Sequence, residues 1–268
     1  MPWKGDKNMK PSFLGHSRPL LTCMLQVETP ECAIAQIRNA VFDGADAFGF
    51  QIEKLRPEFR NAETYQTVFS YMEDKPVYIT NYRHSHSENV TDDARAAELI
   101  TALDAGASLV DVMGDFYDPA PFELTKNKSA IEKQKKLIDA IHQRQGEVLM
   151  SSHVLEFRKA EQVLEIAKEH ERRGADISKI VTASNTEEEM LENLAATAAL
   201  KKELSIPFLF LSGGRFCKMH RMIGPMLGCV MYLCVQAHDG LSTKEQPVLK
   251  SVKAVVDNFD WKPYRKMT

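Results

Sequence analysis

The residue of this chain whose setting points most directly to covalent chemistry is Lys179. It stands in the run Ile177–Val181 (ISKIV), which is otherwise apolar or small and suits a strand buried on both faces. Burial disfavours the charged form of an amine, and a neutral amine can attack a ketone to form a Schiff base. Two other interpretations stay open here: a lysine that reaches solvent at its strand end, or one held in a structural ion pair.

A histidine ends the apolar run that precedes Lys179. His153 closes Val148–His153 (VLMSSH), one repeat earlier in the chain, so the two side chains are expected at adjacent strand ends. An imidazole beside an iminium can move protons on and off the neighbouring carbon. A histidine at a strand end can also be a purely structural hydrogen-bonding group. The pairing with Lys179 is what favours a catalytic role.

Arginines near two other strand ends could bind an anion. Arg221 follows the turn at Gly213 and Gly214, where backbone amides and a guanidinium could bind a carboxylate or a phosphate. Arg83 comes directly after the apolar run Val77–Tyr82 and is a second candidate for the same pocket. Glycine also marks ordinary tight turns, and an arginine in a helix is often simply solvated. Both arginines are nevertheless candidates for binding an anionic group of a small molecule, either a carboxylate or a phosphate.

No metal or organic cofactor is expected. His84, His86 and Glu88 lie close in sequence, but no third strong ligand is in fixed register with the two imidazoles, and polar loops of this kind are normally solvated. The five cysteines are widely spaced and form no C-x-x-C pair. We therefore expect reduced cysteines in the core rather than a zinc site.

The elements that must position these residues alternate along the chain. Short apolar runs alternate with longer amphipathic runs from about Pro19 onward, which is typical of βαβ units. Strands are predicted at Leu20–Gln26, Ala47–Ile52, Val77–Tyr82, Leu109–Met113, Glu147–Ser152, Ile177–Val181, Phe208–Leu211 and Val230–Val235. Helices are predicted between them, among others at Pro30–Phe42, Asp92–Ala105, Ala130–Arg144, Lys159–Arg173, Thr186–Leu204 and Thr243–Asn258. About eight repeats is the number that closes a TIM (β/α)8 barrel, whose reactive groups lie at the C-terminal strand ends.

Helix ends are marked at the same spacing. Gly44, Gly106 and Gly174 each follow a predicted helix, as expected for glycine in a left-handed cap. Thr29 and Thr186 place a hydroxyl, followed by acidic residues, at helix starts. We therefore predict a single α/β barrel domain over residues 19–268, after a frayed arm of residues 1–18. The alternative is a pair of stacked doubly wound halves.

Composition and charge limit the kinds of binding partner and the cellular compartment that we expect. The chain has 268 residues, with 34 lysines and arginines against 37 aspartates and glutamates, so its formal net charge is −3. This balance gives no electrostatic reason to expect nucleic acid, because such proteins usually carry a basic patch. No run approaches the roughly 18 apolar residues of a membrane span, and the N-terminus has no secretory h-region. We expect a cytoplasmic protein that acts on a small molecule.

From about Pro19 to Asn258 the chain resembles type I 3-dehydroquinate dehydratase, the Schiff-base lyase of the shikimate and quinate pathways. Ser151-Ser152-His153 matches the family's Ser-x-His pattern, and GADISKI ending at Ile180 matches its Gly-Ala-Asp-Ile-x-Lys-Ile stretch. The resemblance implies a TIM barrel that eliminates water from a cyclic keto acid. It also implies that Lys179 forms the iminium with the substrate ketone and that His153 transfers the proton.

The resemblance implies further substrate-binding residues. Arg221 looks like the arginine that binds the substrate carboxylate, and Ser242 and Gln246 match the serine and glutamine of a lid loop that contacts the same group. Arg83 looks like the arginine of the family's Thr-x-Arg pattern, with one extra residue inserted. A homodimer is carried over from the family.

The second strand departs from the family pattern. Where the family has Glu-x-Arg-x-Asp, this chain has Gly49–Glu53 (GFQIE), so Gln51 takes the place of an arginine as a substrate-binding candidate. The glutamate that orients the family's histidine falls near Ser87, with Glu88 one place off, and Asp111–Met113 (DVM) replaces Asp-x-Glu. A site built around buried hydrogen-bonding groups rejects analogues that lack the matching group. We therefore expect these changes to alter the substrate more than the reaction type.

Three functions fit these observations. The first is a Schiff-base dehydratase acting on 3-dehydroquinate or a close analogue. The second is a class I aldolase on the same kind of barrel, with Gly213, Gly214 and Arg215 holding a phosphate. The third is a barrel that has lost catalysis and binds a metabolite, since a fold does not guarantee a function. The position of Lys179 relative to His153 separates the enzymatic hypotheses from a structural role.

Overall fold

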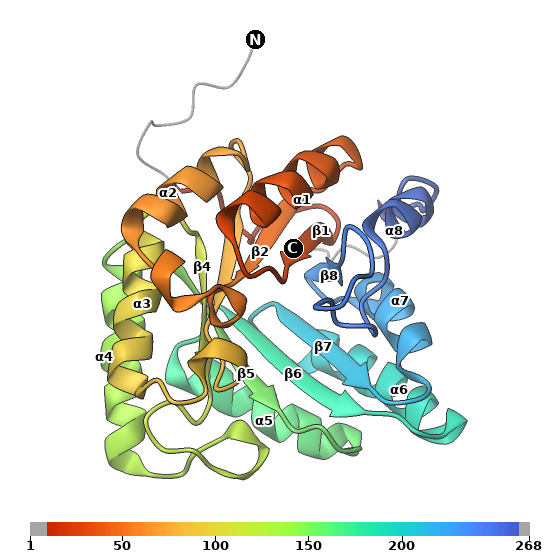
Figure 1. Ribbon diagram of the computed structural model, residues 1–268. Coiled ribbons are helices and arrows are strands. Elements are labelled where there is room, and N and C mark those ends of the chain that lie inside the picture. The colour runs from red at the N-terminus through yellow and green to blue at the C-terminus, as the bar shows by residue number, and fades with distance from the viewer. Residues whose placement is uncertain (1–9, 263–268) are drawn as a thin grey trace.

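The structure is a computed structural model and describes residues 10–262. Eight parallel strands form a nearly closed barrel surrounded by helices (Figure 1). The strands pair in the order β7-β6-β5-β4-β3-β2-β1-β8, and beside the remaining seam the amide of Val230 donates to the carbonyl of Phe208 at 2.9 Å. The single TIM barrel predicted from the sequence is confirmed, and the alternative of two doubly wound halves is wrong.

All eight predicted strands are present, with ends that differ from the predictions by one or two residues where they differ. Their bounds are β1 Leu20–Leu25, β2 Ala47–Gln51, β3 Val77–Thr80, β4 Leu109–Met113, β5 Glu147–His153, β6 Ile177–Ala183, β7 Phe208–Gly213 and β8 Met231–Cys234. β6 runs beyond its predicted end because Thr182 and Ala183 pair with Ser212 and Gly213 of β7. The catalytic candidates on β5 and β6 are therefore held by continuous ladders.

The helices lie between the strands, as the βαβ pattern requires. Their bounds are α1 Pro30–Phe42, α2 Ala62–Ser70, α3 Asp92–Asp104, α4 Lys128–His142, α5 Ala160–Arg173, α6 Glu187–Glu203, α7 Cys217–Leu227 and α8 Leu249–Val256. Thr29 and Thr186 cap α1 and α6 as predicted. The prediction of a helix over Thr243–Asn258 is wrong before Leu249, because Pro247 has no amide hydrogen and disfavours helical geometry in the residue before it.

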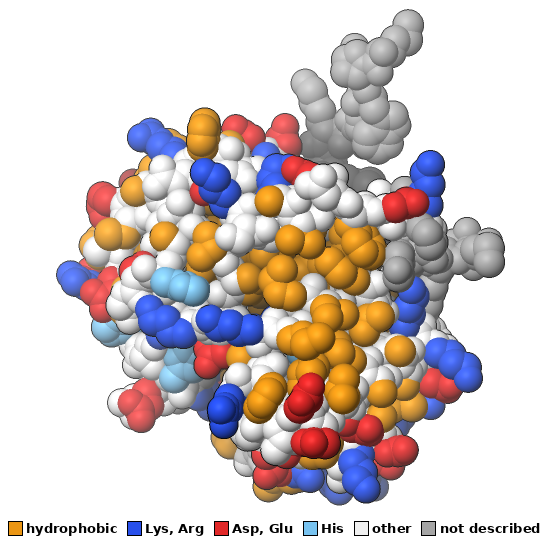
Figure 2. Space-filling view, turned by 90° about the vertical axis from the view of Figure 1, so that its right-hand side faces the viewer, with side chains coloured by type: hydrophobic (Ala, Val, Ile, Leu, Met, Phe, Trp, Pro, Cys, Tyr) orange, Lys and Arg blue, Asp and Glu red, His pale blue; other side chains and the backbone are white. Residues whose placement is uncertain are grey.

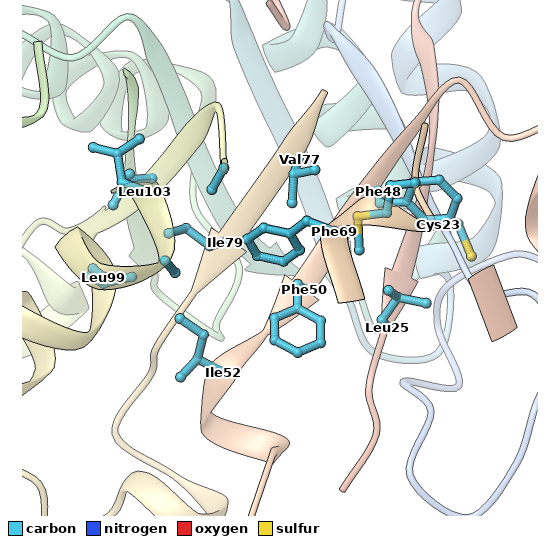
Figure 3. Packing of buried hydrophobic residues seen from close by; sticks show 14 of the residues in the cluster. Cys23, Leu25, Phe48, Phe50, Ile52, Phe69, Val77, Ile79, Leu99 and Leu103 are labelled. Carbon is cyan, nitrogen blue, oxygen red and sulfur yellow. The ribbon is translucent and has the colours of Figure 1, made fainter. Parts of the chain in front are cut away.

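The outward faces of the first strands pack against α2 and α3. Figure 3 shows this cluster, including Cys23, Leu25, Phe48, Phe50, Val77 and Ile79 from strands β1 to β3. Phe50 meets Phe69 of α2 edge to face at 5.7 Å, and burying one such ring stabilises the fold by roughly 2 to 3 kcal/mol. Because side chains alternate along a strand, Gly49 and Tyr78 face the barrel interior instead.

The N-terminal segment is packed against the barrel over its described part. Phe13 is fully buried and meets Tyr78 edge to face with 6.5 Å between ring centroids. The amide of Phe13 donates to Glu147 at the start of β5 at 2.9 Å. The prediction of a frayed arm is therefore wrong for Lys10–Arg18, and residues 1–9 lie outside the described residues.

The cysteines and the helices bear on the expectations of reduced thiols and of no membrane span. All five cysteines are free, and four of them are buried while Cys32 is exposed. Within residues 10–262, no helix has both the length and the apolar character that crossing a membrane requires.

Candidate active site

Lys179 lies in the barrel interior, near the C-terminal ends of the strands. Its side chain is 5% exposed, and its Nζ donates to the hydroxyl of Tyr78 at 3.2 Å and, more closely, to the hydroxyl of Tyr82. The same nitrogen lies 3.4 Å from Oδ2 of Asp111 and 4.8 Å from the centre of the Tyr82 ring. The amine is thus desolvated, and polar and aromatic groups hold it in place.

Asp111 of β4 is the hub of this network. Its carboxylate is completely buried: Oδ1 accepts from the hydroxyl of Ser151 at 2.6 Å, and Oδ2 accepts from Tyr82 at 2.5 Å and from Tyr78. These residues come from β3, β4, β5 and β6 or their C-terminal ends, which are neighbours in the sheet. A buried carboxylate needs such partners to remain charged. We conclude that Asp111 and Lys179 form a buried ion pair surrounded by hydroxyl groups.

The two tyrosines of the network stay protonated. Burial, followed by the charge of Asp111, raises the pKa of Tyr78 and of Tyr82 well above the usual value for a phenol. Each hydroxyl can therefore donate a hydrogen bond at neutral pH. The structure thus places two neutral phenol groups against the amine that could form a Schiff base.

His153 ends β5 and lies closer to the barrel mouth than Lys179. In the ladder between β5 and β6, Ser151 pairs with Lys179 and His153 pairs with Val181, so the histidine is two residues nearer the open end. Its ring meets that of Tyr82 edge to face at 4.8 Å. The structure therefore brings His153 and Lys179 together at adjacent strand ends, as predicted, with Tyr82 in contact with both.

A glutamate orients His153. Oε2 of Glu123 accepts from the backbone amide of His153 at 2.7 Å and lies 2.6 Å from its Nδ1. This contact fixes the imidazole so that Nδ1 faces Glu123, which leaves Nε2 to face away from the carboxylate. Within residues 10–262, no hydrogen-bond partner lies at Nε2. The free ring nitrogen is the one available to a substrate.

The loop that carries Glu123 is rigidly supported. Phe122 and Glu123 have positive φ angles of 62° and 51°, a left-handed conformation that costs non-glycine residues roughly 1 to 2 kcal/mol each. The hydroxyl of Ser152 donates to the carbonyl of Glu123 at 3.0 Å. On either side of this loop in the sequence, the carbonyls of Gly114 and Thr125 accept from the buried guanidinium of Arg173, at 2.7 Å and 2.6 Å. These bonds hold the strained turn in place.

Arg221 provides a buried positive charge. It is 8% exposed, and its Nε donates to the carbonyl of Ser212, near the end of β7, at 2.7 Å. No carboxylate of residues 10–262 lies within 4.0 Å of its guanidinium. Burial lowers its pKa, the expected response of a cation removed from water. Such a group favours an anionic ligand.

The predicted lid residues lie in the loop that precedes α8. Thr243 anchors this loop to the end of β1, since its amide donates to Oε1 of Gln26 at 2.7 Å and its hydroxyl accepts from the Gln26 amide group at 2.7 Å. The hydroxyl of Ser242 is engaged by the backbone of Asp239. Gln246 is 5% exposed, and its Oε1 is buried without a partner in the described part of the chain. That oxygen is available to a ligand.

Gln51 lies across the barrel on β2. By alternation with Gly49 it faces inward, and its Oε1 is likewise buried without a partner among the described residues. Because β2 and β7 are not neighbours in the sheet, we expect Gln51 to meet a different part of a bound ligand than Arg221 does. Two carbonyl oxygens without a partner, those of Gln246 and Gln51, therefore accompany the buried guanidinium of Arg221.

Arg83 does not face the amine. Its guanidinium binds Asp92 at 2.7 Å and Asp115 at 2.7 Å, both outside the Lys179 network. The residue that points inward at this strand end is Tyr82. A shift of one residue along an extended segment moves a side chain to the opposite face, so Tyr82 faces inward where Arg83 faces away.

At Gly49, where the sequence departs from the family pattern, the neighbouring space is filled by Met24. A Cβ atom added at Gly49 would lie 2.2 Å from Sδ and 2.6 Å from Cε of Met24, far inside contact distance. The thioether of Met24 therefore occupies the space beside the β2 strand where a larger side chain would point. The wall of the site is apolar here.

Glu53 and the neighbouring histidines form a separate polar cluster. Burial raises the pKa of Glu53 to about 7, and the hydroxyl of Thr80 bonds to its carboxylate at 3.0 Å. His84 lies 3.8 Å from Glu53, and burial lowers its pKa to about 4. His86 instead approaches Glu28. No three potential metal ligands converge in the portion of the chain that the structure describes.

The glycine-rich turn after β7 is already hydrogen-bonded within the protein. The amide of Phe216 donates to Ser184 at 2.9 Å, and that of Cys217 to Gly214 at 3.3 Å. Gly214 has a φ of 86°, and carbonyl oxygens of Ser184 and Asn185 crowd the position of a would-be Cβ. Two amides after the turn are therefore already bonded within the protein, and the turn gives no support to a phosphate site.

Several residues of the site were not among the sequence candidates. Asp111 could have been found by the argument used for Lys179, because it is a charged residue inside an apolar run. Tyr82 could have been found by alternation from Tyr78. Glu123 gives no such signal, because it reaches His153 from an irregular loop. A cavity of about 550 Å³ lies at the opposite end of the barrel, beside Pro207 and Trp261.

Comparisons with known proteins agree with this geometry. The model of the type I 3-dehydroquinase family matches residues 21–258. The chain is 30% identical over 128 residues to the 3-dehydroquinate dehydratase of Lactiplantibacillus plantarum, which corresponds to 46% of this chain and 49% of that protein. It thus spans about half the length of this curated relative.

Solved structures show the same fold. The 3-dehydroquinate dehydratase of Geobacillus kaustophilus has a TM-score of 0.74 at 17% identity, over 90% of this chain and 91% of that one. The type I enzyme of Clostridium difficile has a TM-score of 0.75 at 18% identity, over 91% and 93% of the two chains. Because the family model covers most of its length, the chain belongs to the type I 3-dehydroquinase family.

Proposed function

We propose that this chain is a carbon–oxygen lyase that dehydrates 3-dehydroquinate, or a close cyclic keto acid, through an imine on Lys179. The observation that carries the proposal is the buried amine of Lys179 beside His153 at adjacent strand ends. A desolvated lysine is suited to attack a ketone, and the resulting iminium withdraws electrons from the neighbouring carbon. The family assignment supports the same reaction.

His153 and Glu123 would carry the proton transfer that follows. Nε2 of His153 takes a proton from the carbon next to the iminium, while Glu123 holds the ring through Nδ1 and stabilises its charged form. The electron pair of the broken C–H bond forms the new double bond as the hydroxyl group leaves. That hydroxyl receives the proton from His153 and departs as water. Glu123 acts as a positioning residue, because it reaches the substrate only through His153.

Arg221, Gln246 and Gln51 would bind the substrate. The unpaired guanidinium of Arg221 is suited to the carboxylate of a keto acid, and burial strengthens such an ion pair. Gln246 and Gln51 each offer a buried carbonyl oxygen that could accept from a substrate hydroxyl. Ser242 contributes by closing the turn that carries Gln246. We assign Arg83 no substrate contact, because two carboxylates already bind it.

The apolar wall at Met24 supports a substrate different from 3-dehydroquinate in its hydroxyl groups. The turn at Gly213 and Gly214 gives no support to an aldolase that holds a phosphate. In the structure of the Clostridium difficile relative, covalently modified comenic acid is present, which supports covalent chemistry with ring-bearing carboxylates in this family.

Dehydration produces a double bond conjugated with the carbonyl, so ultraviolet absorbance reports the reaction. We expect the wild type to form this product from 3-dehydroquinate or a related cyclic keto acid, and Lys179→Met to lose at least about a thousandfold in kcat. Lys168→Met, on an exposed side chain, is the matched control and should retain activity. Thermal stabilisation by these acids without any turnover would instead favour a barrel that only binds metabolites.

We further propose that the protein is a cytoplasmic homodimer. Figure 2 shows hydrophobic side chains gathered on the side of the molecule where α6, α7 and α8 lie. Met219 of α7 and Leu191 of α6 are 51% and 54% exposed, and Met222, Ile223 and Met226 of α7 are only partly buried. An apolar face on an outer helix is typical of an interface. Sedimentation of the wild type should give twice the monomer mass, and Met219→Glu should give monomers; a monomeric wild type contradicts the proposal.

A further inference from the structure

Tyr82 lies between the two residues of the proposed reaction. Its hydroxyl bonds to Nζ of Lys179 and to Oδ2 of Asp111, and its ring packs against that of His153. Tyr82 is 7% exposed, so this contact is shielded from water. A ketone that reaches Nζ therefore meets the phenol oxygen of Tyr82 next to the nitrogen that it must bond.

We propose, on the basis of the function above, that Tyr82 is a catalytic residue that passes protons between Lys179, Asp111 and the ketone oxygen during imine formation. Its oxygen can accept from the amine while its proton moves to Asp111, and the same path can run in reverse. This role differs from that of His153, which acts on the carbon next to the imine.

The proton count of imine formation requires such a path. A lysine ammonium carries three protons and the iminium carries one, so two protons must move from nitrogen to the ketone oxygen, which leaves as water. Asp111 takes the first proton through Tyr82, and the free amine pair then forms the C–N bond. Tyr82 next protonates the carbinolamine oxygen, and Asp111 replaces the proton. The C–O bond breaks once the oxygen has received its second proton by the same route.

The two tyrosines of the network differ in position. Tyr78 lies inside β3, where its ring covers Phe13 and its hydroxyl is 3.2 Å from Nζ. Tyr82 follows the strand end and contacts both the amine and the histidine. Because burial raises the pKa of both phenols, each is an acid that holds its proton until a stronger base is presented. Only Tyr82 is also placed toward the barrel mouth, where the substrate enters.

The test is the rate of imine formation rather than overall turnover. The protein is mixed with 3-dehydroquinate, quenched with borohydride at increasing times, and the fraction carrying the added ligand mass is measured. We expect Tyr82→Phe, which keeps the ring against His153, to slow the appearance of the adduct by about 100-fold or more, within the range of general acid–base catalysis. Tyr78→Phe removes the other phenol bonded to the amine, which lies outside the proposed relay, and should slow the adduct less, by no more than about tenfold.

Asp111→Asn provides a second variant that leaves both rings in place. It should slow the same step, because the relay then lacks its base. Adduct formation by Tyr82→Phe at the wild-type rate, or equal slowing by both tyrosine variants, overturns the role of Tyr82 and leaves the proposed function intact. A wild type that never forms the adduct, with several cyclic keto acids tried, overturns the proposed function together with the relay.

Discussion

The two sides of the barrel mouth differ in the side chains that they present to the interior. On the side of β5 to β8, Lys179, Arg221 and Gln246 are buried and His153 is partly exposed. Nε2 of His153 and Oε1 of Gln246 have no hydrogen-bond partner among the described residues. On the side of β2 and β3, Met24 fills the space beside Gly49 and Tyr82 takes the inward position next to Arg83. The first side carries the groups that we propose to bind a carbonyl and a carboxylate. The second presents an apolar wall and a phenol instead.

The difference shows that neighbouring strands of a barrel can change independently. Each inward position is filled from one strand. The outward positions are fixed by packing against helices, as Phe50 of β2 is by Phe69 of α2. A shift of one residue at one strand end would therefore exchange the side chains there without disturbing the next ladder. The following predictions test how separate the two sides are.

The largest effect is expected from the two arginines. Arg221→Leu removes the unpaired buried cation and should lower kcat/KM by about 100- to 1000-fold, the loss of roughly 3 to 4 kcal/mol of binding to a charged group. Arg83→Leu removes the cation that pairs with Asp115, whose side chain is nearly buried. It should instead lower the free energy of unfolding by about 2 to 4 kcal/mol. Steady-state kinetics and urea unfolding separate the two. A large rise in KM for Arg83→Leu would show that the two sides are not distinct.

The apolar wall at Gly49 and Met24 can be tested by placing a glutamate at position 49, as in the family pattern. Gly49→Glu drives a side chain into Met24 and should destabilise the protein by roughly 2 to 3 kcal/mol, as overpacked sites do. Met24→Ala should relieve most of that loss when combined with it, so a double-mutant cycle gives a favourable coupling energy. Additive losses in urea unfolding would mean that Met24 does not occupy this space.

Glu123 contacts His153, on the β5 side of the mouth, from a loop that no sequence pattern singled out. Glu123→Gln keeps the shape but weakens the hold on Nδ1 of His153, so we expect kcat to fall by about 10- to 100-fold with little change in KM. Glu156→Gln, on an exposed residue after β5, is the control. An unchanged kcat, or a fall in KM alone, contradicts the positioning role.

The smallest effect concerns stability away from the mouth. His170 is fully buried between Ser152 and Ser178, and burial lowers its pKa to about 3. Because the folded state resists protonation, stability should be lost as pH falls from about 6.5 towards 3, by on the order of 2 kcal/mol at pH 5. His170→Gln should flatten that decline in urea unfolding measured between pH 7 and 5. An equally steep decline would assign it to other groups, such as His220, whose pKa burial lowers to about 4.

Much of the fold follows from local pattern. The eight strands and the caps at Thr29 and Thr186 were predicted because apolar runs and capping hydroxyls act within a few residues. Helix α7 was not among the predicted helices, and it contains Gly224 and Pro225, which weaken any helical signal. Phe13 was assigned to a frayed arm because its burial depends on the distant residues Tyr78 and Glu147.

The site was predicted only in part, for a related reason. Lys179 and Asp111 are charged residues within apolar strands, so each carries its own signal, although only the first was used. The exchange of Arg83 for Tyr82 depends on which face a strand end presents, and a motif comparison with one inserted residue does not show this. The contact of Glu123 with His153 is set by a loop whose path no periodicity describes.

The central claim is that the nitrogen of Lys179 becomes covalently bonded to the substrate carbonyl carbon. Wild-type protein incubated with 3-dehydroquinate or a related cyclic keto acid and reduced with borohydride should gain one ligand mass, and peptide mapping should place it on Lys179. An adduct on another lysine, or normal turnover in a protein that gains no mass after reduction, contradicts the account.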